Sequence, residues 1–469
     1  MKLYLAIDLG TTGCRSIIFD EELKEISSSY SEYPLITKGG GFVEQDANLW
    51  WHLTVKTALS AISQSGISSQ NIDGISISSQ GISIVPVDEE CNPLCNAIGW
   101  LDTRAGVEAE EFKNDFGEDK IRKITGKPCS SVYTLPKILW IKDNEPEIYE
   151  KAYKLLMPLD FLTAKFTGNF VTDHSMASGT LMYDLEKVCW SDEILKRYGI
   201  DIEKLPKLAY AGEIAGTVLP EIRDILGLKD TCIVAVGAQD QKCAALGAGL
   251  DENSITISLG TAAAVTKLWK NLENSVAENV TWCGYTEPES WVTEGVVATA
   301  GTCLRWVRDT FYKGEKYSVI DMEAEAAIEQ GNSLIFLPFM SGENGAFYGV
   351  SLADKRANFA AGVMEGVALE IRALLENMSA YEKKRRIILF GGGAKSRLWC
   401  QIISDVTGME ISVPSTEEAA GAGAARAAAL AAGKMINPLS CSKVYKPQKS
   451  YEEKYKKYLL ISGNFKEQE

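Results

Sequence analysis

Histidine is almost missing from this chain, and its cysteines are not grouped as metal or disulfide sites require. Only two of the 469 residues are histidines, and His52 and His174 stand far apart. The eleven cysteines are scattered, and none forms a C-x-x-C pair. Because a structural zinc site needs four such ligands at short spacings, we expect none. This pattern is typical of a cytoplasmic protein with reduced, mostly buried thiols.

Long apolar runs and an excess of positive charge are missing as well. The apolar run at residues 3–7 ends at Asp8, which makes it too short for a signal peptide. No charge-free apolar run approaches the roughly 18 residues of a membrane span, so we expect no membrane partner. The formal net charge is −15. Since nucleic-acid binders normally present a basic surface, we expect no nucleic-acid partner either.

What the chain does contain is a short turn that occurs twice. The two common phosphate-loop motifs, G-x-x-x-x-G-K-[ST] and a G-x-G-x-x-G after a strand, are both absent. Instead, residues 7–12 read Ile-Asp-Leu-Gly-Thr-Thr and residues 257–262 read Ile-Ser-Leu-Gly-Thr-Ala, each between strand-like runs. The repeat lies near the start of each half, which predicts an internal duplication. We therefore place two domains at residues 1–249 and 250–469.

Strand and helix patterns alternate in both halves, which predicts an α/β architecture. Strands are predicted at residues 72–78, 232–236 and 387–390, and helices at residues 50–63, 133–142, 396–407 and 417–432. The glycines at positions 247 and 249, beside the domain boundary, fit either a hinge or the C-terminus of a helix.

Two of the predicted strand ends carry groups that suit phosphate chemistry. Glycines let the backbone approach an anion closely, and Thr11 and Thr12 add hydroxyl donors. Asp8, at the end of its strand, could hold Mg²⁺ through water. An ordinary hairpin turn explains either copy alone, but two copies favour a nucleotide between the halves. Asp240 follows a predicted strand and opens a helix, which suits either an N-cap or a catalytic carboxylate.

Two other segments have both a functional and an ordinary explanation. Three glycines at residues 391–393 leave room for a flat ring to stack on the backbone, or they form a flexible helix entry. Trp100, Asp102 and Arg104 occupy alternate positions, so in an extended segment they share one face. That face suits a sugar platform, although a surface ion pair beside a core tryptophan explains it too.

The ordered set of segments resembles the FGGY family of carbohydrate kinases, which has the actin/Hsp70-like ATPase fold. The resemblance covers roughly residues 3–433, and several segments, especially residues 172–180, are most similar to the xylulokinase branch. The matching segments are residues 8–12, 98–104, 135–140, 158–162, 172–180, 237–241, 258–261, 337–343, 365–366 and 391–401. The resemblance implies two ribonuclease-H-like domains with a central cleft.

The resemblance also implies roles for individual residues. Asp240 matches the catalytic base, which takes the proton from the sugar hydroxyl that attacks the γ-phosphate of ATP. Asp8 matches the residue that organises Mg²⁺. The nucleotide is expected at Thr11, Thr12, Gly260, Thr261, Gly301, Arg305, Gly392, Gly393 and Ala394. The sugar is expected at Gln80, Gly81, Ile82, Trp100, Asp102 and Gln241.

One segment departs from the xylulokinase pattern. Where xylulokinases typically carry Gln-Met-His-Gly, residues 80–83 read Gln-Gly-Ile-Ser, so the imidazole contact is absent. We expect an ATP-dependent kinase of a small sugar, most similar to kinases of the ketopentose D-xylulose. Ribulose, glycerol and erythritol are alternative acceptors. A non-catalytic actin-like nucleotide switch is the alternative from another class, and Asp240 argues against it because a switch needs no base. The sequence leaves the oligomeric state open, and a homodimer is one candidate.

Overall fold

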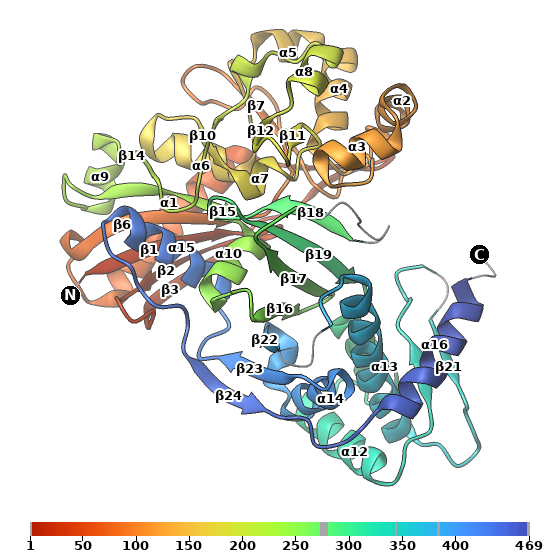
Figure 1. Ribbon diagram of the computed structural model, residues 1–469. Coiled ribbons are helices and arrows are strands. Elements are labelled where there is room, and N and C mark those ends of the chain that lie inside the picture. Colours follow the sequence, from red (N-terminus) through yellow and green to blue (C-terminus); the bar gives the residue numbers. More distant parts are fainter. Residues whose placement is uncertain (1, 273–279, 343–344, 382–384, 467–469) are drawn as a thin grey trace.

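The computed structural model describes residues 2–272, 280–342, 345–381 and 385–466, and it contains one large mixed β-sheet in each half of the chain (Figure 1). The first sheet has the order β14 (Ile214–Thr217), β15 (Ile233–Gln239), β6 (Ile72–Ser79), β1 (Leu3–Leu9), β2 (Gly13–Phe19) and β3 (Glu25–Glu32). The second has the order β18 (Thr281–Gly284), β19 (Trp291–Val297), β17 (Ala263–Trp269), β16 (Ser254–Leu259), β22 (Arg386–Phe390), β23 (Glu410–Pro414) and β24 (Cys441–Tyr445).

The two sheets repeat one strand arrangement. β1 pairs antiparallel with β2 and parallel with β6, and β16 pairs antiparallel with β17 and parallel with β22. The pattern continues outward, since β2–β3 and β17–β19 are antiparallel while β6–β15 and β22–β23 are parallel. Both Leu-Gly-Thr turns therefore join equivalent strands. The predicted α/β architecture is confirmed, together with the repeat of its first hairpin.

Helices flank both sheets, and the four predicted helices are confirmed as α1, α4, α14 and α15. The main helices are α1 (Ala47–Ser65), α2 (Gly106–Phe116), α3 (Glu118–Thr125), α4 (Thr134–Asn144), α6 (Pro158–Thr167), α7 (His174–Ala177), α10 (Asp240–Ala248), α11 (Gly301–Phe311), α12 (Tyr317–Glu329), α13 (Arg356–Asn377), α14 (Arg397–Thr407), α15 (Ala419–Ala431) and α16 (Glu452–Lys466). Local sequence explains their ends. Asp46 accepts the N–H groups of the first turn of α1, and Gly66, in the left-handed region, ends it.

Two helices join the halves at their interface. α15 comes from the end of the chain, yet it packs on α10 and on strands β1 and β6 of the first sheet (Figure 1). A Cβ atom on Gly247 would lie 2.1 Å from the carbonyl oxygen of Ala419, so only glycine allows this approach. Gly249, at φ 83°, ends α10 in the left-handed region. The two explanations for these glycines were a hinge and the C-terminus of a helix. The structure supports the helix C-terminus at Gly249, and close helix packing explains Gly247.

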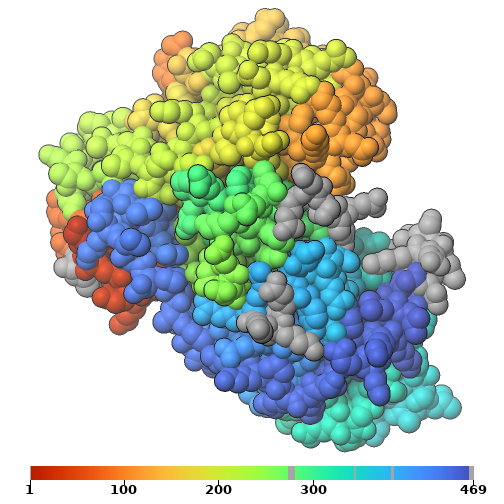
Figure 2. Space-filling view, viewed as in Figure 1, coloured from red at the N-terminus to blue at the C-terminus, as the bar shows by residue number. Residues whose placement is uncertain are grey.

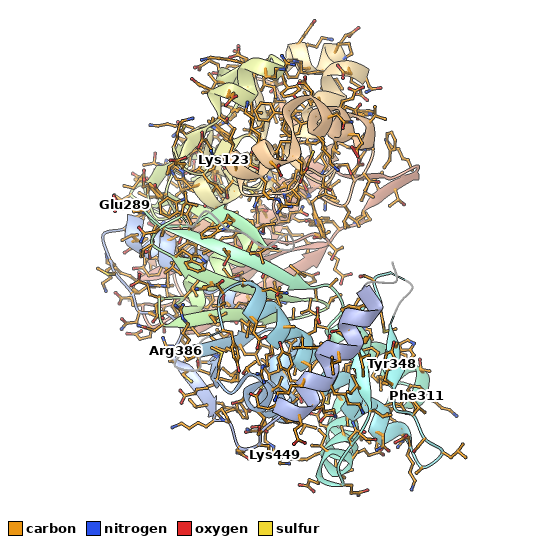
Figure 3. All side chains as sticks on the ribbon, turned by 45° about the vertical axis from the view of Figure 1, so that its right-hand side comes forward. Lys123, Glu289, Phe311, Tyr348, Arg386 and Lys449 are labelled. Atoms are coloured by element: carbon orange, nitrogen blue, oxygen red, sulfur yellow. The ribbon has the colours of Figure 1, made fainter. Side chains whose placement is uncertain are left out.

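The halves form two lobes with the central segments between them. In Figure 2 the orange and yellow residues of the first half gather above and most blue residues lie below. Figure 3 accordingly shows Lys123 in the upper lobe and Phe311, Tyr348 and Lys449 in the lower one. No described helix is both long and apolar enough to cross a bilayer. All eleven cysteines have free thiols, as expected.

Candidate active site

A cavity of about 330 Å³ lies where the carboxyl ends of β1, β6 and β15 meet the second half of the chain. These three strands are mutually parallel, so the residues that follow them converge at one edge of the sheet, which is where α/β proteins usually bind ligands. The second half adds Thr281 of β18 and Glu294 of β19. The first half supplies Thr11, Gln80, Gly81, Ile82, Trp100, Lys127, Tyr133, Ser175, Met176, Gly179, Gln239, Asp240, Gln241 and Lys242.

Asp240 is the first residue of α10 and lies on the cavity wall. The N-cap of this helix is Gln239, so capping does not explain Asp240. The Asp240 carboxylate accepts hydrogen bonds from the backbone N–H of Gln241, at 2.6 Å, and from the Gln239 amide. Burial, followed by the charge of Asp8, raises the pKa of Asp240 to about 7. A carboxylate that titrates near neutral pH is a competent proton acceptor.

Asp8, on β1, is the second acid at this edge of the sheet. Its Oδ1 accepts a hydrogen bond from Ser78 Oγ at 2.9 Å, on the neighbouring β6. Burial raises the pKa of Asp8, and the Ser78 hydrogen bond opposes that rise. In the turn that follows, Thr11 Oγ1 accepts from the indole N–H of Trp100 at 2.9 Å, while Thr12 is exposed. The first Leu-Gly-Thr turn is thus attached to the cavity wall.

These two acids set what kind of metal ion the site could hold. Among the described residues, no group of three or more histidine, cysteine, aspartate or glutamate side chains could hold a metal ion. Mg²⁺ does not need such a group, because it keeps several waters and usually binds one or two carboxylates together with substrate phosphates. The charge of Asp8 helps to raise the pKa of Asp240, so a cation beside them would be favourable. The donor set therefore fits a hydrated Mg²⁺.

The second Leu-Gly-Thr turn contacts the start of α11. The N–H of Gly301 donates to the carbonyl oxygen of Gly260 at 3.0 Å, and the N–H of Thr302 donates to that of Thr261 at 3.2 Å. A Cβ atom on Gly301 would lie only 2.4 Å from the Gly260 oxygen, so this position requires glycine. Arg305, one turn further along α11, is exposed. The structure thus brings together Gly260, Thr261 and Gly301, which are three of the seven residues predicted to bind nucleotide in this half.

The three-glycine segment borders a second cavity, of about 390 Å³, lined by Gly391 and Ala394. Two of the glycines have a packing role as well. Cβ atoms on Gly391 and Gly393 would lie 3.0 Å from the Leu259 oxygen and 2.4 Å from Leu259 Cγ. Only Gly392 faces open space. Two of the three glycines are therefore needed because the segment packs on the second Leu-Gly-Thr turn.

Gln80, Gly81, Ile82, Trp100 and Gln241 line the first cavity, close to Asp240. Gln80 is almost fully buried, and its amide donates to Gln45 Oε1 at 2.8 Å. Ile82 has a φ of 56°, which is rare for a β-branched residue. Strained backbone of this kind concentrates at functional sites. The Ile82 side chain packs on Gly179 and makes this part of the wall apolar.

The expectation that Trp100, Asp102 and Arg104 share a face is wrong. The segment is a turn, not a strand, because the N–H of Asp102 donates back to the carbonyl oxygen of Gly99 at 3.1 Å. Trp100 lines the cavity, but Asp102 is fully buried outside it. Its Oδ2 accepts from the backbone N–H of Val43 at 2.6 Å and pairs with Arg104 at 2.8 Å. Asp102 therefore holds the loop that carries Trp100.

Sequence reasoning left several wall residues without a role. They are Lys127, Tyr133, Ser175, Met176, Gly179, Lys242, Thr281 and Glu294. Ser175, Met176 and Gly179 fall in the segment at residues 172–180, which marked the family without suggesting a contact. Ser175 Oγ accepts the N–H of Gln239 at 3.1 Å and so supports the strand end before Asp240. Lys242 follows Asp240 by two positions, and this closeness in the sequence is the signal that could have placed it in the site.

The fold and the cavity define a class of enzyme in which two duplicated α/β domains enclose a phosphoryl-transfer site. Comparison with known proteins agrees. The models of the N-terminal and C-terminal domains of the FGGY family of carbohydrate kinases match residues 3–247 and 255–432. The chain belongs to this family. The actin/Hsp70-like fold is confirmed with it, and the protein is a sugar kinase that uses ATP as co-substrate. Of the family segments, residues 337–343 end at Glu343, which lies outside the described residues.

Several relatives are similar over most of the chain. A xylulose kinase of Lactococcus lactis subsp. lactis is 31% identical, over 92% of this chain and 88% of the relative. A xylulose kinase of Bacillus subtilis is 30% identical, over 92% and 89%. A xyloylose kinase from Brucella ovis, known from its crystal structure, has a TM-score of 0.90 and 27% identity over the whole of both chains. A gluconokinase of Bacillus subtilis is 28% identical, over 92% and 88%.

Proposed function

We propose that this kinase transfers the γ-phosphoryl group of ATP to a hydroxyl of a small sugar, with D-xylulose or a similar ketopentose as the acceptor. The observation that carries the proposal is the position of Asp240, which lines a cavity bounded by five of the six predicted sugar residues and by Thr11 of the first turn. The cavity volume, about 330 Å³, is at the small end of the range for ligand sites. The xylulose kinase relatives support the same acceptor class.

In the proposed reaction Asp240 takes the proton of the acceptor hydroxyl while that oxygen forms a bond to the γ-phosphorus. The bond from phosphorus to the bridging oxygen breaks, and ADP leaves with the electron pair. Phosphoryl transfer depends mainly on positioning and charge neutralisation, because its transition state is loose. The N–H groups of the two Leu-Gly-Thr turns would bind phosphate oxygens on either side of the cleft.

Asp8 would hold Mg²⁺, mainly through water. When bound, this ion would neutralise part of the charge that develops on the transferring group. Asp240 would remain outside the direct ligand set, because its carboxylate must be free to receive the acceptor proton. Thr11, Thr12, Gly260, Thr261, Gly301, Arg305 and the segment Gly392–Gly393–Ala394 would bind the nucleotide.

The identity of the acceptor rests on the wall that contains Ile82. Its side chain replaces the imidazole that xylulokinases typically place there, so the acceptor loses one polar contact. Ribulose, glycerol and erythritol remain alternative acceptors, and the gluconokinase relative adds a sugar acid to that set. We also propose that residues 1–249 hold the sugar and the base and that residues 250–469 hold the nucleotide. The proposal also includes a homodimer as a candidate assembly of the enzyme.

The experiment is a coupled assay of ADP release from Mg-ATP over a panel of ketoses, aldoses, polyols and gluconate. We expect the highest kcat/KM with a ketopentose. Omission of the sugar and Asp240→Asn are the two controls, and both should reduce ADP release to the background. Release of ADP that no sugar increases would refute the proposed reaction. A preference for a polyol or for gluconate would refute the ketopentose alone.

A further inference from the structure

The first Leu-Gly-Thr turn is held in place by side chains from outside it. Gln45, the last residue of β5 (Phe42–Gln45), donates from its amide to the carbonyl oxygen of Thr11 at 2.6 Å. Trp100 donates from its indole to the hydroxyl of the same threonine at 2.9 Å. Gln45 is only 1% exposed and does not belong to the residues that line the acceptor cavity. It can therefore affect the turn only through its hydrogen bonds and its packing.

Gln45 also contacts the wall of the acceptor cavity. Its Oε1 accepts from the amide of Gln80 at 2.8 Å, and Gln80 lines the cavity. Chemistry fixes both amide orientations. The Thr11 carbonyl can only accept, so it faces Gln45 Nε2, which leaves Gln45 Oε1 to accept from Gln80 Nε2. The Oε1 of Gln80 is then buried without a protein partner among the described residues. A hydroxyl of an acceptor in the cavity would supply that partner, since buried amide oxygens normally have one.

The carbonyl groups of the turn all bind protein donors. The backbone N–H of Tyr33 donates to the carbonyl oxygen of Thr12 at 3.0 Å, and the hydroxyl of Tyr33 donates to that of Gly10. Gln45 occupies the third carbonyl, that of Thr11. The N–H groups of Thr11 and Thr12, by contrast, donate to no protein atom within the part of the chain that the structure describes. The turn therefore presents unpaired N–H groups, which is how backbone binds an anion.

Gln45 sets the direction of one of these N–H groups. None of the described peptide bonds is cis. In a trans peptide the C=O and N–H bonds point in opposite directions, so the bond between Thr11 and Thr12 directs the Thr12 N–H away from Gln45. Thr12 is exposed. Without the bond from Gln45, this peptide could rotate and turn its carbonyl oxygen toward a phosphate. Gln45 is thus placed to keep the donor side of the peptide outward.

We propose that Gln45 is a positioning residue that links the acceptor site to the phosphate-binding turn. An acceptor hydroxyl that donates to Gln80 Oε1 fixes the Gln80 amide, and the Gln80 amide in turn fixes that of Gln45. Gln45 then holds the peptide between Thr11 and Thr12 with its N–H toward the phosphates of ATP. Bound sugar should therefore raise the affinity for ATP, and ATP should raise the affinity for sugar by the same factor. The inference rests on the proposed function, since it takes this cavity as the acceptor site and this turn as a phosphate site.

The test measures the affinity for a non-hydrolysable ATP analogue with Mg²⁺, by titration calorimetry, without the best acceptor and at an acceptor concentration that saturates each protein. In the unmodified protein the acceptor should tighten binding of the analogue by a factor of about five or more. Gln45→Met keeps the length of the side chain but removes both hydrogen bonds. It should weaken binding of the analogue and bring this factor close to one. Gln80→Met leaves Gln45 on Thr11, so it should lose the factor while the affinity without the acceptor changes little.

Two further variants separate this role from a structural one. Gln401 makes a matching pair of bonds in the second half, since its Nε2 donates to the carbonyl oxygen of Lys446 at 2.8 Å and its Oε1 accepts from Gln448 Nε2 at 3.3 Å. Gln401→Met should lower the melting temperature and leave the factor unchanged. Gln45→Asn keeps the amide on a shorter side chain, and it is the milder variant if Gln45→Met does not fold. It should reduce the factor by less.

The outcomes are distinct. Loss of the factor in Gln45→Met and Gln80→Met, with the factor intact in Gln401→Met, supports the inference. An unchanged factor in Gln45→Met, or in Gln45→Asn where Gln45→Met does not fold, would overturn it, even if affinity or stability falls. So would an unmodified enzyme that phosphorylates an acceptor without binding the analogue more tightly in its presence.

The proposed function fails in a different way. If no sugar increases ADP release, or if Asp240→Asn stays active, the assignment of the site itself is wrong. That result is known from the coupled assay before any analogue is titrated.

Discussion

The raised pKa of Asp240, the proposed catalytic base, predicts an unusual pH dependence for this kinase. An aspartate with its ordinary pKa of about 3.9 is fully ionised throughout the neutral range. In this structure burial and Asp8 raise the pKa of Asp240 to about 7. The base is then about 10% ionised at pH 6 and about 90% ionised at pH 8. Since only the ionised form accepts the proton, kcat/KM for the sugar should rise about tenfold between these values.

The assay is coupled ADP release with the sugar varied and with Mg-ATP saturating at each pH. Asp240→Asn keeps the size of the side chain but removes its basicity, so it should lose about 10²- to 10⁴-fold in kcat. The residual activity should also lose the acid limb near pH 7. Binding of ATP should be retained, which a titration of the variant with nucleotide checks. A profile that is flat from pH 5.5 to pH 8, or a variant with near-normal turnover, would refute the reasoning.

Three other substitutions test separate parts of the structure. Asp8→Ala should raise the KM for Mg-ATP more than tenfold and change sugar affinity little, because Asp8 lies at the proposed Mg²⁺ site. Gly301→Ala forces a Cβ atom to 2.4 Å from the Gly260 oxygen, so it should displace the second turn and weaken ATP binding by at least tenfold in a nucleotide titration. Burial raises the pKa of Asp160 to about 8, so ionisation opposes the folded state. The free energy of unfolding should therefore fall as the pH rises from about 4 toward 8. The side chain of Asp160→Asn does not ionise, and its amide could donate to Thr172. The melting temperature of this variant should therefore depend less on pH.

Each of these three predictions can be contradicted by a specific result. Loss of sugar affinity alone in Asp8→Ala would remove that residue from the Mg²⁺ role. Unchanged nucleotide affinity in Gly301→Ala would show that the turn tolerates a side chain. A melting temperature of the unmodified protein that stays constant from pH 5 to pH 8 would contradict the assignment for Asp160.

The architecture was predictable because it follows from local patterns. Short strands such as β1 and β6 are buried along most of their length, as strands in the middle of a sheet must be. The Leu-Gly-Thr turns repeat because equivalent hairpins repeat. The order of the family segments points to the catalytic-base candidate and to the turns. Each of these segments is recognisable from a few consecutive residues.

The shared face of Trp100, Asp102 and Arg104 was not predictable, because spacing along the chain does not determine direction in space. Trp100 and Asp102 are two positions apart, yet a turn sends one into the cavity and the other into an ion pair. Likewise, no local pattern shows that Gly391 and Gly393 are required by contact with Leu259, more than 130 residues earlier. Contacts of this kind depend on the packing of distant elements.

The sequence by itself determined the class of fold, the position of the repeated turns and the residue types that phosphoryl transfer needs. Only the tertiary structure decided which of these groups meet. It joined Lys242 to Glu294 across the halves, buried Asp240 near Asp8 and so moved the pKa of Asp240 toward neutrality. The physical reason is that charge interactions and burial depend on distance and on exclusion of water, and both arise when segments far apart in the chain are packed together.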